Sequence, residues 1–159
     1  MDVKIFEKIY EENKKLDKIF YELYGNSDEI MLKNKLELLV ELGELANETK
    51  CFKYWTNKLP NRDMVLEEYA DCMLMVFYMF NDLDVSLDEE FIEPKENDII
   101  KQFMYLFEIT SKINREYNKK IVKEIFINLV YLGHLLEFTD EDIISGCMRK
   151  IEINIKRIT

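Results

Sequence analysis

Several residue types are scarce in this sequence, and each shortage narrows the kind of protein that it encodes. Among 159 residues there are four glycines and two prolines, the residues that most often interrupt helices. Three cysteines in no metal-ligand spacing argue against a disulfide framework or a zinc site, and they fit a reducing compartment. The single histidine, His134, is interpreted as a packed or surface residue rather than a ligand.

The sequence also has fewer basic than acidic residues, and it has no long apolar run. Lys and Arg number 22 against 32 Asp and Glu, and the resulting net charge of -10 argues against a general nucleic-acid or anionic-membrane binder. The longest apolar run, Cys72–Phe80, is less than half of the ~20 residues that a membrane-spanning helix needs. Since the sequence opens without a signal-peptide pattern, we expect a cytoplasmic protein with neither nucleic acid nor membrane as a partner.

The residues that are abundant predict helices. Hydrophobic residues make up 48% of the chain, and its long segments of Leu, Ile, Met, Glu and Lys show no period-2 alternation. We therefore expect an all-α fold, a bundle of about six helices in a single domain over residues 1–159. The predicted helices cover residues 3–24, 28–49, 63–83, 98–115, 119–137 and a last segment that follows Thr139, which can cap it in a capping box with Asp142.

A line of glutamates marks the second predicted helix. Counted from the first, the four lie at i, i+4, i+7 and i+11, so they share one face with no Lys or Arg among them. Like charges at i,i+4 cost a few tenths of a kcal/mol each, and solvated stripes usually mix Glu with Lys. A solvated stripe is one interpretation and a cation site is the other. The line consists of Glu37, Glu41, Glu44 and Glu48.

A glycine lies inside the same helix. Gly43 stands between two of these glutamates, where a glycine costs about 1 kcal/mol relative to alanine. We expect it to permit the close approach of a substrate or of the facing helix.

The third predicted helix favours the cation site. Its residues 69–80 leave no polar face, which is typical of a central buried helix. Glu68 and Asp71 lie at its start among apolar neighbours, where an unpaired ionised carboxylate is costly, unless the helix start protrudes into water. Antiparallel pairing with the preceding helix would bring Glu41 and Glu44 opposite them. Four such carboxylates need hard divalent cations to coexist, and Mg²⁺ suits oxygen-only ligands.

These residues resemble a known family. Glu-x-x-Glu on one helix and Glu-x-x-Asp on the next is similar to the metal-binding signature of the all-α nucleotide pyrophosphohydrolases of the MazG-like superfamily. The longer string LLVELGELANETKCFKYW, Leu38–Trp55, resembles the dimeric dUTPase branch in the form common among low-GC Gram-positive bacteria and their phages. Asn13–Asp17 is similar to that branch's Gln-x-x-Leu-Asp, and Lys150–Arg157 to its terminal Lys-Asn-Glu-Ile-Asn-His-x-Arg, so nearly the whole chain is covered. The sequence departs from the family pattern at Asn13, Leu74, Ile151 and Ile155, where Gln, His, Asn and His are usual.

The resemblance implies Mg²⁺-dependent hydrolysis of dUTP to dUMP and pyrophosphate, within a four-helix active-site core. More than one Mg²⁺ ion is expected, with Mn²⁺ as a substitute. A metal-activated water would attack the α-phosphate, and Glu41 would orient and deprotonate it. The expected metal ligands are Glu41, Glu44, Glu68 and Asp71.

Six residues are the candidates for binding the nucleotide. Lys53, Lys150 and Arg157 would hold phosphates, although the last two also fit basic residues that the helix dipole favours near a C-terminus. Trp55 would pack against uracil, or it is a core anchor. Asn13 would read the edge of the base with its amide. Asn154 completes the set, because it lies at i+4 from Lys150 on the last predicted helix.

Two further expectations concern assembly and alternative functions. The predicted helices at 98–115 and 119–137 carry more large apolar residues than one buried face needs, so we expect a homodimer built largely from them rather than a monomer with an all-apolar central helix. One alternative function is a broader MazG-like pyrophosphatase that acts on another or a damaged nucleotide. The other is a non-catalytic helical interaction protein whose acidic line is a solvated or partner-binding surface.

Overall fold

The structure is a computed structural model that describes residues 1–158. This range contains α-helices and two short 3-10 helices and no strand, which confirms the all-α prediction. Thr159, the last residue of the predicted domain, lies outside the described range. The helices are α1 (Glu7–Tyr24), α2 (Asp28–Thr49), α3 (Arg62–Leu83), α4 (Ile99–Ser111), α5 (Lys119–Leu135) and α6 (Asp140–Ile158), with 3-10 turns at Val3–Phe6 and Lys112–Asn114.

Short side chains that accept backbone hydrogen bonds account for where the helices begin. The Ile30 N–H donates to Ser27 Oγ at 3.2 Å at the start of α2. At the start of α6 the Thr139 N–H donates to the Asp142 carboxylate at 2.9 Å, and the Asp142 N–H donates to the Thr139 hydroxyl at 3.1 Å. The predicted capping box is therefore confirmed.

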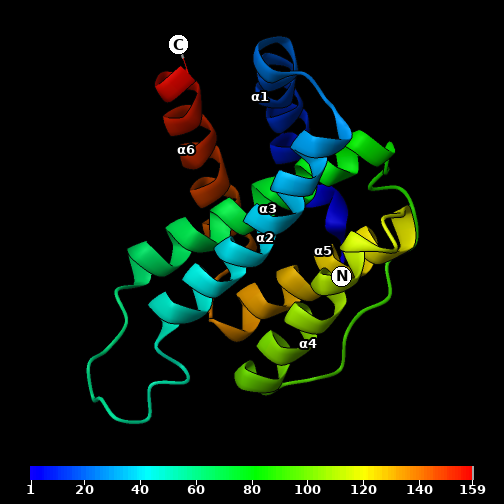
Figure 1. Cartoon of the computed structure of the whole chain (residues 1–159). Helices are drawn as coiled ribbons and strands as arrows, with labels where there is room; N and C mark the ends of the chain where they lie inside the picture. The colour runs from blue at the N-terminus through cyan, green and yellow to red at the C-terminus, as the bar shows by residue number, and fades with distance from the viewer. Residues whose placement is uncertain (159) are drawn as a thin grey trace.

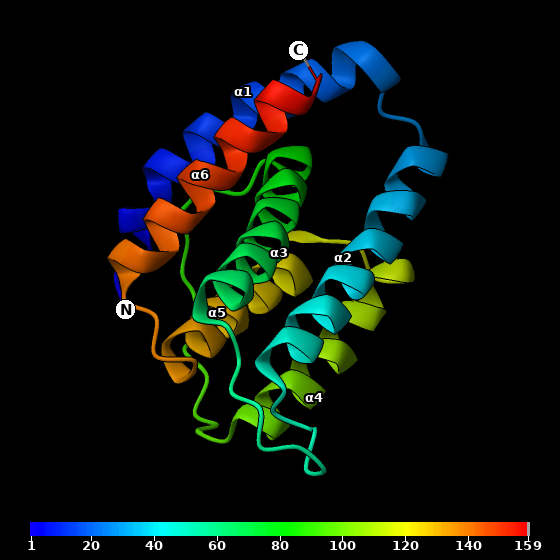
Figure 2. The same cartoon turned by 90° about the vertical axis from the view of Figure 1, so that its left-hand side faces the viewer.

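Helix α3 lies at the centre of the bundle. Nearly every side chain from Tyr69 to Phe80 is buried, as the absence of a polar face predicts. Helix α2 packs antiparallel beside α3 (Figure 1), and α1 and α6, which run in the same direction, also pack against α3 (Figure 2). This arrangement brings the acidic segments of α2 and α3 together.

Helix α5 is covered by the chain itself. It packs against α3 and α4, and its apolar side chains are buried around most of its circumference. The expectation that α5 supplies exposed apolar surface for a dimer is therefore wrong, because α5 packs on two sides within one chain. The large apolar side chains that stay exposed on α2 and α4 are Leu32, Leu36, Val40, Ile100, Met104 and Tyr105.

The connection between α2 and α3, residues 50–61, projects from the end of the α2–α3 pair (Figure 1). None of the helices in residues 1–158 combines the length and the apolar character that crossing a membrane requires.

Candidate active site

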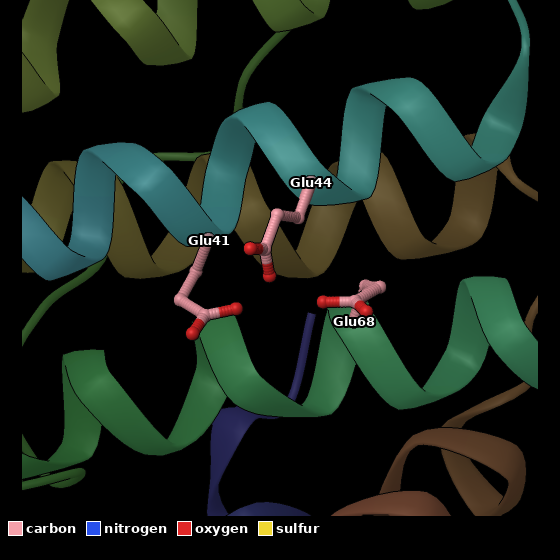
Figure 3. Close-up of side chains that lie close together, drawn as sticks. All are labelled: Glu41, Glu44 and Glu68. Atoms are coloured by element: carbon pink, nitrogen blue, oxygen red, sulfur yellow. The ribbon is translucent and has the colours of Figure 1, made fainter.

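Three carboxylates converge between α2 and α3. Glu41 and Glu44 project from α2, and Glu68 projects toward them from α3 (Figure 3). One oxygen from each side chain can be chosen so that all three atoms lie within 4.8 Å of one another. Antiparallel pairing of the two helices thus brings the predicted carboxylates face to face.

The packing of α2 explains why these glutamates point at α3. Leu38, Leu42 and Leu45 are all buried and anchor one stripe of α2 in the core. Glu41 and Glu44 lie beside this stripe, one turn apart, at the edge where α2 meets α3. Their side chains are therefore held near α3, with Glu41 partly buried and Glu44 still exposed to water.

Burial and neighbouring charges make Glu41 and Glu68 reluctant to ionise. Burial, followed by the charges of Asp71 and Glu44, raises the pKa of Glu41 to about 8. Burial and the Glu44 charge likewise raise the pKa of Glu68 to about 7. When these carboxyls ionise, the site concentrates negative charge that Lys150 offsets only in part.

Asp71 lies close enough to Glu41 to affect its pKa, but its carboxylate binds a lysine. Lys150 on α6 is buried, and its Nζ lies 3.1 Å from Asp71 Oδ2 and 3.2 Å from Glu67 Oε1. Burial lowers the pKa of Lys150, but the hydrogen bonds and charges of Asp71 and Glu67 outweigh this effect and raise it. Asp71 therefore lies next to the cluster of Glu41, Glu44 and Glu68, but it pairs with Lys150 instead of joining the cluster.

A cavity of about 540 Å³ opens beside these carboxylates. Side chains from α1, α2, α3 and α6 line it, so four helices surround the candidate site. Six of the predicted site residues line this one cavity: Asn13, Glu41, Asp71, Lys150, Asn154 and Arg157.

Two predicted substrate residues lie elsewhere. Lys53 and Trp55 belong to the projecting connection after α2 and do not line the cavity, and the Trp55 side chain is 64% exposed. Trp55 packs edge-on against Phe52 and Tyr54, its neighbours in that connection, and its exposure shows that the core-anchor interpretation is wrong. Its packing against uracil stays a prediction.

Gly43 does not sit at a close approach within the described residues. A Cβ added there would meet no atom within 4 Å, outside its own helix turn and its chain neighbours. The expected role of Gly43 in letting the facing helix approach is thus wrong for this single chain.

Sequence reasoning missed an acidic residue of the cavity. Asp17 on α1 lines it and is buried, and this burial raises its pKa to about 7. Glu37, the first member of the glutamate line, also lines the cavity, and burial raises its pKa. A signal for Asp17 was present, because it follows Asn13 at i+4 on the side of α1 that carries Leu16.

The carboxylates fit a hard divalent cation. Glu41 Oε2 and Glu68 Oε2 are buried oxygens that accept no hydrogen bond within residues 1–158. A buried unpaired carboxylate oxygen is costly, and a bound cation would satisfy it. The cluster offers oxygen donors alone, which suits Mg²⁺ or Mn²⁺ better than zinc.

Comparison with known protein families decides the chain's identity. The sequence model of the dUTPase family matches residues 5–159, nearly the full length. The chain belongs to the all-α dUTPase family. It is therefore a dUTP diphosphatase, a pyrophosphohydrolase that converts dUTP to dUMP and pyrophosphate, and the family generally depends on divalent metal ions.

No curated protein matches the sequence. The membership in the dUTPase family confirms the predicted resemblance and sets aside the non-catalytic alternative. In this dUTPase the three glutamates and the adjoining cavity are the candidate site for metal and nucleotide.

Proposed function

We propose that this dUTPase uses Mg²⁺ ions held by the α2–α3 carboxylates. The observation that carries the proposal is the convergence of Glu41, Glu44 and Glu68 within 4.8 Å, with two buried oxygens that lack partners, beside a cavity. Asp71 completes the predicted ligand set once Lys150 releases it. More than one ion fits a set of four carboxylates, and Mn²⁺ is the expected substitute.

The bound ions would neutralise the triphosphate and stabilise charge at the α-phosphate. The chain supplies the base. Glu41 takes the proton of the attacking water, whose oxygen bonds to the α-phosphorus as the bond to the bridging oxygen breaks and pyrophosphate leaves.

Helix α6 provides the cationic side of the cavity. Lys150, Asn154 and Arg157 lie at i, i+4 and i+7, so they share one face of α6, and all three line the cavity. We infer that Lys150 and Arg157 hold phosphate oxygens and that Asn154 adds a neutral hydrogen bond. Lys150 would then exchange Asp71 and Glu67 for phosphate when the substrate binds.

The test is an assay of dUTP hydrolysis with purified protein. Incubation with dUTP and Mg²⁺ should yield dUMP and pyrophosphate in equal amounts, and EDTA should stop the reaction. Mn²⁺ should restore activity after EDTA treatment and dialysis. Turnover that persists in EDTA would contradict the metal-based mechanism while leaving dUTP as the substrate.

We also propose that two copies associate through α2. Leu32, Leu36 and Val40 recur every four residues on the outer face of α2, and each is about half exposed or more. Gly43 continues this face with open space around it, so a partner helix could approach closely there. Each active site would remain mostly within one subunit, because α1, α2, α3 and α6 of one chain line the cavity.

We further propose a cytoplasmic location. Cys51, Cys72 and Cys147 are free thiols, as expected in a reducing compartment.

A further inference from the structure

The cavity has a second polar end, which lies away from the glutamate cluster. Along α3, the cavity wall passes from Asp71 to Leu74 and then to Tyr78, each about one turn further from Glu68. Asn13 on α1 faces this end and is only 2% exposed. With the phosphates at the glutamate cluster and Lys150, as proposed above, the base would lie toward Asn13.

The hydrogen bonds of Asn13 determine which way its amide points. Its Nδ2 donates to the backbone carbonyl of Leu74 at 3.2 Å, and it also lies 3.4 and 3.5 Å from the two carboxylate oxygens of Asp17. A backbone carbonyl can only accept, so the nitrogen must lie on this side. Within residues 1–158, Asn13 Oδ1 accepts no hydrogen bond.

Asp17 is itself held in place. The Nδ2 of Asn81 on α3 donates to Asp17 Oδ2 at 3.3 Å, so the carboxylate bridges α1 and α3. Asp17 is 4% exposed, which makes it a buried acceptor rather than a solvated surface charge. Both amide hydrogens of Asn13 therefore have fixed acceptors, Leu74 and Asp17, and only its oxygen remains for a ligand.

We propose that Asp17 and the Leu74 carbonyl lock the Asn13 amide with its oxygen toward the nucleotide base, and that this selects uracil over cytosine. Asp17 is a positioning residue, because it acts through Asn13. The inference deepens the dUTPase function and rests on the proposed placement of the base at Asn13.

The hydrogen-bonding groups of the bases explain why the amide oxygen favours uracil over cytosine. Uracil carries a hydrogen on N3, which can donate to Asn13 Oδ1, whereas N3 of cytosine carries a lone pair. In the same position cytosine would place two acceptors against each other and leave both unpaired. Thymine carries the same N3–H as uracil, so the locked amide cannot distinguish these two bases.

The experiment compares kcat/KM for dUTP, dCTP and dTTP on wild type and on Asp17→Leu. Without Asp17, one amide hydrogen of Asn13 loses its acceptor and the Leu74 carbonyl alone orients the amide. The preference for dUTP over dCTP should then fall, by up to about tenfold, a typical loss for one unmet hydrogen bond. The preference for dUTP over dTTP should not change, which a general loss of structure does not predict. If Asp17→Leu fails to fold, Asp17→Ala carries the same expectation.

A double-substitution test assigns the effect to Asn13. Asn13→Ala should also lower the preference for dUTP over dCTP, and adding Asp17→Leu to it should lower this preference no further. Ile9→Val is the matched control, because Ile9 is buried on the same helix but does not line the cavity. It should leave both preferences unchanged.

The outcomes separate this inference from the proposed function. A folded Asp17 variant that hydrolyses dUTP with unchanged preference over dCTP overturns the inference alone. So does a wild type that hydrolyses dUTP and dCTP equally well. A wild type without Mg²⁺-dependent dUTP hydrolysis overturns the proposed function, and the inference with it.

Discussion

At Glu41, burial and neighbouring charge both oppose ionisation. The raised pKa values of Glu41 and Glu68, about 8 and about 7, mean that the metal-free protein holds protons near neutral pH that an exposed glutamate would have released. Because the folded protein then binds more protons than the unfolded chain, the stability of the metal-free protein depends on pH.

The metal-free protein should lose stability as pH rises from about 4.5 toward about 8. In this window the folded protein binds more protons than the unfolded chain, whose glutamates ionise near 4.5, so the free energy of unfolding falls with pH. Urea unfolding in EDTA at several pH values measures the slope.

Two controls assign that slope to the site. Glu41→Gln should reduce it, leaving the smaller slope that comes from Glu68 and Asp17, whose pKa values are each raised to about 7. Saturating Mg²⁺ should raise stability most at pH 8, since the metal binds the ionised carboxylates. A stability that rises with pH in EDTA would contradict the buried cluster.

The carboxylates could be predicted from sequence, whereas some of their neighbours could not. Glu41, Glu44 and Glu68 follow from helical spacing and the pairing of two helices. The link from Asp71 to Lys150 joins residues 79 positions apart and depends on how α6 packs on α3, which local spacing does not reveal. The spacing of Asp17 from Asn13 places it on the same side of α1, but its contact with Asn81 joins residues 64 positions apart and depends on how α1 packs on α3.

At the scale of elements, local signals placed the helices well. Thr139 caps α6 as expected, and Ser27 and Asp98 cap α2 and α4 in the same way, because capping depends on residues three positions apart. The position of Trp55 was not predictable, since residues 50–61 carry no periodic pattern that fixes their path. The burial of α5 was missed because an apolar circumference fits both a dimer interface and an internal helix.

Helix α2 offers a direct test at Gly43. In a monomeric background such as Leu36→Glu, alanine there should raise the free energy of unfolding by about 0.5–1 kcal/mol, because helix propensity improves and the added methyl meets no atom of its own chain within 4 Å. Chemical denaturation measures this change, and dUTP turnover should stay the same because Gly43 lies on another face of α2 than Glu41. Loss of turnover at full stability would show that substrate approaches α2 at Gly43 after all.

At the scale of the whole molecule, the exposed stripe on α2 predicts assembly. Wild type should have twice the chain mass of 19.2 kDa in light scattering at micromolar concentration. Leu36→Glu should shift the mass to that of the monomer, since Leu36 is 63% exposed in the single chain and a charge would be buried between copies.

A matched substitution locates the interface. Met104→Glu on α4 changes another exposed apolar residue and should leave the mass at the dimer value if α2 alone forms the interface. A wild-type mass near 19.2 kDa would rule out the dimer, and a dimeric Leu36→Glu protein would rule out the α2 stripe as its interface.

The most direct test of the central claim, that the α2–α3 glutamates hold the catalytic metal, is Mg²⁺-dependent dUTP hydrolysis by Glu44→Gln. The substitution keeps the size of the side chain and removes one of the three converging carboxylates. We predict a loss of kcat/KM of about a hundredfold or more, with metal-free stability equal to or above wild type because repulsion is relieved. Glu29→Gln, on the same helix but paired with Lys33 at the surface, should keep wild-type activity. Near-normal activity of Glu44→Gln would contradict the assignment of the site.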